Sequence, residues 1–177
     1  MKACEQTKGQ SVYQHGQSVY AYFCDLRESQ KFDWRLPSWF NLKLFENIHD
    51  EDIVKDYLIF HDIGKPFCRE IDSEGKVHFP NHAETSKRVF LEDGGSPIAA
   101  NLIGWDMVLH SCSAEEIKSY CSQWTIKDAY TLLLASLSEI HSNSRLFGGI
   151  ESISFKSKWK NLERRGKQVC KHFFGEN

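Results

Sequence analysis

The segment Tyr57-Leu-Ile-Phe-His61-Asp62-Ile-Gly64-Lys-Pro66 joins an apolar helical stretch to an adjacent His-Asp pair and then to two residues that break helices. Apolar residues occupy much of the circumference of the preceding stretch, so we expect a central helix that ends at this pair. An imidazole nitrogen beside a carboxylate suits a divalent transition metal. By itself, the pair is equally typical of a helix C-terminus at which the imidazole meets the last carbonyls.

His15 lies on the apolar stripe of the first predicted helix. Residues 11–28 carry apolar side chains at helical spacing, and His15 falls on the stripe between Val12 and Val19. We therefore expect His15 to point inward. A single inward histidine is more often a satisfied core residue than a ligand, so its weight depends on its partners.

Two later histidines lie at the ends of predicted helices. His82 falls in the first turn of a helix that we expect behind an Asn81 cap, with Glu84 as the capping-box residue. His110 ends a helix expected over residues 97–110. Together with His15, these residues turn the His-Asp pair into a candidate metal site.

The rest of the chain predicts an all-α fold with one minor β-hairpin. The hairpin is expected over residues 67–80, with a turn at Asp72–Gly75 and apolar contacts from Ile71, Val77 and Phe79. No internal repeat is apparent. Further helices are predicted over residues 113–124, 125–143 and 150–177.

Length and composition indicate an ordinary globular protein. The 177 residues are expected to form a single domain. No apolar run is long enough to span a bilayer and the N-terminus lacks the apolar core of a signal peptide, so we expect a cytoplasmic location. The six cysteines contain no CxxC pair, which argues against a zinc ribbon and a disulfide framework. We expect reduced, mostly buried thiols.

The C-terminal segment is basic, although the whole chain carries a formal net charge of -2. A basic helix over residues 150–177, packed on or beside an acidic body, could guide a polyanion, so nucleic acid is a candidate partner. The alternative is a solvated helix face that keeps the protein soluble. The cations are Lys156, Lys158, Lys160, Arg164, Arg165, Lys167 and Lys171.

The order of these motifs resembles the HD-domain superfamily of metal-dependent phosphohydrolases. Its first histidine is matched by His15 in YQHGQSV, its His-Asp pair by His61 and Asp62 in HDIGK, and its further histidines by His82 in HFPNHAE and His110 in VLHS. The segments HDIGKP and DSEGKVHFPNHAE are most similar to the HD domains of tRNA nucleotidyltransferases and their stand-alone relatives. The resemblance covers residues 11–143 and implies an HD-domain-like helical bundle.

The chain departs from this family at the distal aspartate. The family places that residue in an Ala-Asp-Leu setting, which here reads Ala135-Ser136-Leu137. Serine is a poor metal ligand at neutral pH because its hydroxyl keeps its proton. Glu139, on an adjacent part of the same helix face, is the expected substitute, and Asp128 is a weaker one. The alternative is an incomplete site with low metal affinity.

The resemblance implies a phosphomonoesterase or phosphodiesterase that acts on a nucleotide or nucleic-acid phosphate. One or two ions of Mn, Fe, Co, Ni or Zn are expected; two ions sharing a carboxylate can activate water and clamp the oxygens of a phosphoryl displacement. Asp62 and Lys65 are the expected catalytic residues, and Lys65 and Arg69 the expected phosphate contacts. The expected metal ligands are His15, His61, Asp62, His82, His110 and Glu139.

Other interpretations remain open at this point. Lys65 could instead be a cation that caps the helix C-terminus. The main alternative for the whole chain is a degenerate HD module that binds nucleotide or nucleic acid without catalysis, and a di-iron oxygenase is a third class. His49, His78, His141 and His172 have no spacing that ties them to the set, so they are expected to be surface or structural residues.

Overall fold

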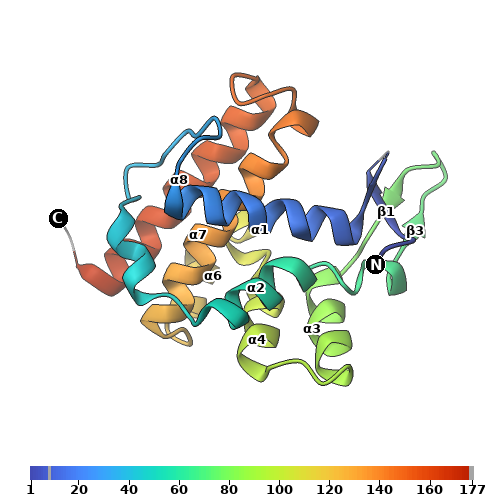
Figure 1. Ribbon diagram of the computed structural model, residues 1–177, viewed down its shortest axis with the longest axis horizontal. Coiled ribbons are helices and arrows are strands. Elements are labelled where there is room, and N and C mark those ends of the chain that lie inside the picture. Colours follow the sequence, from blue (N-terminus) through green and yellow to red (C-terminus); the bar gives the residue numbers. More distant parts are fainter. Residues whose placement is uncertain (8, 176–177) are drawn as a thin grey trace. The chain divides into compact units, whose positions relative to one another are not determined.

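The computed structural model describes residues 1–7 and 9–175, and the chain forms two compact units. One comprises residues 1–20 and 51–106, and the other comprises residues 21–50 and the chain from residue 107 onward. The described ranges are mostly helical, with two short two-stranded antiparallel hairpins (Figure 1). The all-α prediction with minor β structure is therefore confirmed. The single domain over residues 1–177 stays a prediction.

The first unit contains both hairpins and the helices that follow them. The start of α1 belongs to this unit, α3 packs beside α4, and α4 packs against α2 (Figure 1). Its elements in chain order are β1 (Glu5–Thr7), β2 (Gln10–Ser11), α1 (Val12–Glu28), α2 (Glu51–Phe60), η2 (Lys65–Phe67), β3 (Glu70–Ile71), β4 (Val77–His78), α3 (His82–Glu92) and α4 (Pro97–Trp105).

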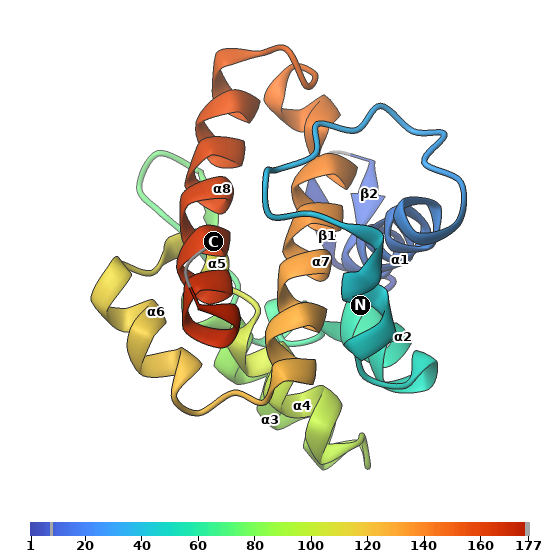
Figure 2. The same ribbon diagram turned by 90° about the vertical axis from the view of Figure 1, so that its left-hand side faces the viewer.

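The second unit is organised around one buried helix. Most residues of α7 are buried, and α8 and η1 pack against it (Figure 2). After the last residues of α1, its elements are η1 (Leu42–Asn47), α5 (Val108–Ser111), α6 (Ala114–Cys121), α7 (Ile126–Ser142), η3 (Ser144–Phe147) and α8 (Ile153–Phe174). None of the helices in the described ranges combines the length and apolarity needed to cross a membrane.

Three expectations about helix ends and one about the thiols need correction. The helix predicted over residues 97–110 is interrupted between α4 and α5, where buried Asp106 accepts a hydrogen bond from the Tyr57 hydroxyl at 2.8 Å. Asn81 adopts a left-handed conformation with φ 51°, and its side chain makes no capping hydrogen bond. The helix predicted to reach residue 124 ends at Cys121. No disulfide links the six cysteines, and only Cys121 is fully buried.

The hairpin prediction is confirmed in position but not in packing. Strands β3 and β4 pair in the expected place, yet Ile71 is 58% exposed and Val77 is 37% exposed. The two-residue strands are too short to form an apolar face. The β1–β2 hairpin was not expected, because its polar residues lack the alternation that marks a half-buried strand.

One member of the predicted basic surface lies inside the second unit. Phe155, Leu162 and Val169 form the expected buried stripe of α8, but Arg165 is also buried. Its guanidinium donates to three carbonyls at the end of α5: Nε to Cys112 O at 2.8 Å, and Nη1 to His110 O at 2.8 Å and Leu109 O at 3.3 Å. Arg165 therefore caps the helix that carries His110 and is not exposed on the surface that was expected to contact a polyanion.

Replacing this cap should destabilise the second unit. We expect Arg165→Met to lower the free energy of unfolding by about 2–4 kcal/mol, because buried carbonyls lose a charged donor. Urea denaturation followed by circular dichroism measures the change. Arg164→Met is the matched control, because Arg164 is exposed and should change stability by less than about 0.5 kcal/mol. Equal effects in the two variants would contradict the capping role.

Asp25 organises the chain where α1 ends. Burial alone would raise the pKa of its carboxyl, but hydrogen bonds outweigh this effect and lower the pKa to about 2. The donors are the Ser29 hydroxyl at 2.6 Å, the Trp34 indole at 2.8 Å, and the backbone N–H groups of Lys31 and Phe32 at 3.0 Å. The Asp25 carboxylate thus stabilises the turn by which the chain leaves α1.

Asp25→Asn should lower the free energy of unfolding by about 1–2 kcal/mol at neutral pH, because a neutral amide accepts hydrogen bonds less strongly than a carboxylate. The loss is no larger than this because water partly screens the charge at this half-buried site. The folded pKa is depressed, so the stabilising effect is present above the unfolded pKa of about 3.9 and is lost as pH falls toward about 2. Denaturation curves of both proteins at pH 6 and near pH 2.5 measure this. A stability difference that is independent of pH would contradict the role of the charge.

Candidate metal centre

The first unit gathers three histidine rings around one buried carboxylate. His61 and Asp62 lie in the turn immediately after α2, His15 is the fourth residue of α1, and His82 begins α3. The Nε2 atoms of His61 and His15 lie 3.3 Å and 3.9 Å from Asp62 Oδ2, and Nε2 of His82 lies 3.7 Å from Asp62 Oδ1. His15, His61 and Asp62 are each at most 2% exposed.

Backbone carbonyls fix the orientation of two of these rings. Nδ1 of His61 lies 2.8 Å from Leu58 O, and Nδ1 of His82 lies 3.0 Å from Phe79 O. A carbonyl can only accept, so each Nδ1 carries a hydrogen, and Nε2 is the atom with a lone pair in the neutral ring. The carbonyl contacts are those that orient histidine ligands in metal sites.

The donors fit a cation. Without one, neutral rings would direct their Nε2 lone pairs at the negative oxygens of Asp62. Protonation of the rings relieves that repulsion, and so does a metal ion. Donors on a tetrahedral ion with bonds of about 2.1 Å lie about 3.4 Å apart, close to the separations around Asp62. One ring nitrogen of His15 also lies within 4.8 Å of one of His61, so this pair could contribute to a metal site.

The Asp62 carboxylate is held in its charged form. Burial alone would raise its pKa, but the adjacent His61 ring and the charge of Lys65 hold the pKa well below its usual range. Lys65 Nζ lies 2.6 Å from Asp62 Oδ2. Lys65 is therefore half-buried and pairs with the central carboxylate instead of capping the preceding helix.

Two glycines allow the elements of this site to approach one another. A Cβ on Gly16 would lie 2.2 Å from Ile59 O, so α1 can contact α2 this closely only at a glycine. A Cβ on Gly64 would lie 2.4 Å from the backbone nitrogen of Ser86, whose buried hydroxyl accepts the Gly64 N–H at 2.9 Å. Gly16 and Ser86 were missed from sequence, because close backbone approach leaves no periodic signal.

A pair of glycine substitutions tests this packing. Gly16→Ala should lower the free energy of unfolding by about 1–3 kcal/mol, because backbone atoms of Ile59 block the new methyl group. Gly104→Ala is the control within α4, where the nearest atom is the flexible end of Lys87. There the gain in helix propensity, about 1 kcal/mol, should leave stability unchanged or raised. Thermal and urea unfolding measure both; similar losses in the two variants would contradict the packing constraint.

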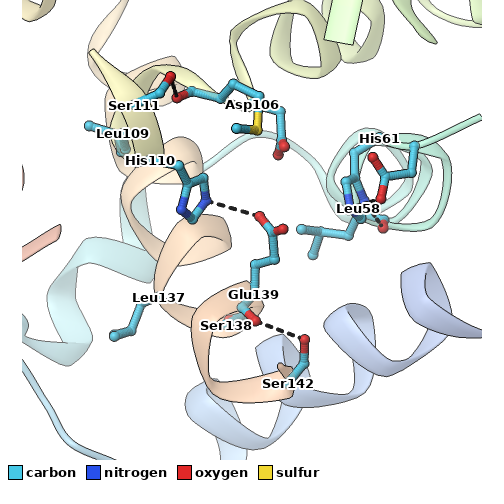
Figure 3. Close-up of polar contacts among 12 residues, drawn as sticks. Leu58, His61, Asp106, Leu109, His110, Ser111, Leu137, Ser138, Glu139 and Ser142 are labelled. Carbon is cyan, nitrogen blue, oxygen red and sulfur yellow. Dashed lines mark hydrogen bonds and ion pairs between the residues drawn. The ribbon is translucent and has the colours of Figure 1, made fainter. Parts of the chain in front are cut away.

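The second unit brings together the other two predicted ligands. His110 on α5 and Glu139 on α7 form an ion pair with 2.9 Å between Nε2 and Oε2 (Figure 3). Ser136 is buried on α7, and its Oγ has no hydrogen-bond partner within the described residues. Asp128 is already used, because it closes the α7 capping box with Thr125. It stays a prediction that His110 and Glu139 bind the same metal ion as the histidines of the first unit.

The remaining predicted residues have identifiable positions. Arg69 is exposed and lines a cavity of about 740 Å³ with Pro66 and Val77. The excluded histidines make local contacts: His49 pairs with Asp128 at 2.7 Å, His78 with Asp72 at 2.6 Å, buried His141 accepts the Arg35 N–H at 3.0 Å, and His172 packs on Phe173.

Comparison of the chain with protein-family models, curated proteins and solved structures found no match.

Proposed function

We propose that this chain is a metal-dependent phosphohydrolase that acts on a nucleotide or nucleic-acid phosphate, as its resemblance to the HD-domain superfamily implies. The observation that carries the proposal is the buried Asp62 carboxylate with three histidine Nε2 atoms around it at 3.3–3.9 Å. The buried His15, His61 and Asp62 are hard to explain as core packing, because burying polar groups together is costly unless a cation compensates.

In this proposal His15, His61, His82 and Asp62 hold one or two ions of Mn, Fe, Co, Ni or Zn. A bound metal would supply Lewis acidity that polarises a phosphoryl oxygen and activates water. Asp62 offers one oxygen toward His15 and His61 and the other toward His82, so it can serve two sides of the site. Lys65 Nζ, beside Asp62 Oδ2, would contact a phosphate oxygen, and exposed Arg69 would bind a more distant part of the substrate.

One observation favours the second candidate, a binding module without catalysis. The 2.6 Å contact of Lys65 with Asp62 Oδ2 neutralises the carboxylate with a cation that the chain itself supplies. With Ser136 in the place of the family's distal aspartate, the Lys65 ammonium would be the resident cation of such a module. Metal content and turnover measured together distinguish the two candidates.

Asp62→Asn should remove the metal while preserving side-chain shape. We expect metal affinity and phosphate release to fall by at least about a hundredfold, because a ligand contributes at least as much as the groups that orient it. Elemental analysis of purified protein, with phosphate release from nucleoside monophosphates, cyclic nucleotides and short oligonucleotides, measures both. Asp72→Asn is the matched control, because Asp72 also pairs with a histidine but is exposed.

The outcomes separate the candidates. Bound transition metal with turnover that depends on Asp62 supports the enzyme. Absence of turnover with every substrate supports the binding module. Absence of transition metal together with absence of turnover would contradict the enzyme proposal. Full activity of Asp62→Asn would exclude a role for Asp62 in metal binding and catalysis.

A further inference from the structure

The solvent face of α8 carries a continuous basic stripe. Its members recur at intervals of three or four residues, which places them on one side of the helix. Phe155, Leu162 and Val169 occupy the buried side of the same helix. The basic stripe consists of Lys156, Lys160, Arg164, Lys167 and Lys171; Lys156 is half-buried and the other four are exposed.

The stripe leads into a cavity of about 890 Å³ between η1 and the C-terminal part of α8. Lys167 and Lys171 line this cavity and also belong to the stripe. The other lining residues that matter here are Lys43 and three aromatic residues, Trp39, Tyr130 and Phe174. Trp39 and Tyr130 are almost fully buried, whereas Phe174 is 44% exposed and its ring lies 5.1 Å from that of Tyr130.

Among the described residues, the local charge remains positive after the neighbouring carboxylates are counted. Glu163 lies 2.8 Å from Lys167, but it also accepts hydrogen bonds from the Ser38 N–H and hydroxyl at 2.9 Å and 2.6 Å. Glu151 pairs with Lys156 at the start of the stripe, and Glu46 lines the cavity. Lys160 and Arg164 form no ion pair within the described residues.

We propose that this surface binds single-stranded nucleic acid, with phosphates along the basic stripe and a base stacked on Phe174 in the cavity. The eleven-residue interval from Lys160 to Lys171 spans about 17 Å of helix, which is long enough to contact several phosphates. Proteins commonly bind single-stranded nucleic acid through exposed aromatic rings beside cations, because an unstacked base can lie on the ring. Duplexes keep their bases stacked and offer none to such a cavity.

This inference does not depend on the metal centre. Binding is therefore measured in EDTA, with a fluorescein-labelled oligouridylate of about twelve nucleotides and fluorescence anisotropy at several salt concentrations. Four stripe cations predict a slope of log K against log salt of about -3, from about -0.7 for each neutralised phosphate. Lys167→Gln/Lys171→Gln should weaken binding at least tenfold and reduce the magnitude of the slope by about 1.4.

Matched variants separate the stripe from net charge. Lys31→Gln/Lys55→Gln changes net charge equally through exposed lysines outside the stripe, and it should leave the affinity and slope unchanged. Phe174→Ala should weaken binding about tenfold without changing the slope, and Phe174→Tyr should restore it, because stacking needs an aromatic ring.

Three results would overturn the proposal. Equal losses of affinity in the two double-lysine variants would show that binding depends on net charge and not on this particular surface. A duplex of the same length that binds as tightly as the single strand would exclude base stacking. Competition by uridine monophosphate at concentrations similar to those of the oligonucleotide would indicate a mononucleotide site instead.

Discussion

The first unit depends on compensating the charge of a buried carboxylate. Asp62 is almost completely removed from water, and an ionised carboxylate in that position is costly unless cations and hydrogen-bond donors surround it. Compensation requires α1, the turn after α2 and α3 to converge on one point. Gly16 and Gly64 make that convergence sterically possible, and the Ser86 hydroxyl secures the turn. The compensation of the Asp62 charge therefore depends on close backbone packing at these two glycines.

The same donor set can be satisfied in two ways, and this gives the proposed function its physical content. Lys65 already supplies a cation 2.6 Å from Asp62, while the Nε2 atoms of His61 and His82 are oriented by backbone carbonyls as metal-binding rings are. A lysine neutralises a carboxylate but cannot accept the lone pairs of neutral imidazoles. A metal ion would satisfy both, and so would protonation of the rings.

In α8, cations serve two different purposes on opposite sides of one helix. Arg165 faces inward, and its planar guanidinium donates to several carbonyls at the end of α5, a geometry that lysine could not reproduce. The cations on the solvent side have room to meet phosphates. Because Arg165 is buried in the fold, charge counted along the sequence overstates the basic surface.

The sequence by itself determined the all-α class, the positions of most helices, the β3–β4 hairpin and the inward direction of His15. These properties follow from periodicity, capping residues and turn residues, which act over a few neighbours. The grouping of His15, His61 and His82 around Asp62 was a hypothesis drawn from their helix positions and from the resemblance; its distances appear in the folded chain. Only the tertiary structure decided that Lys65 pairs with Asp62, that Asp106 lies in a helix break, that Arg165 is buried and that Gly16 touches Ile59. Each depends on groups that are distant in sequence or on side-chain direction in three dimensions, and neither is encoded in local pattern.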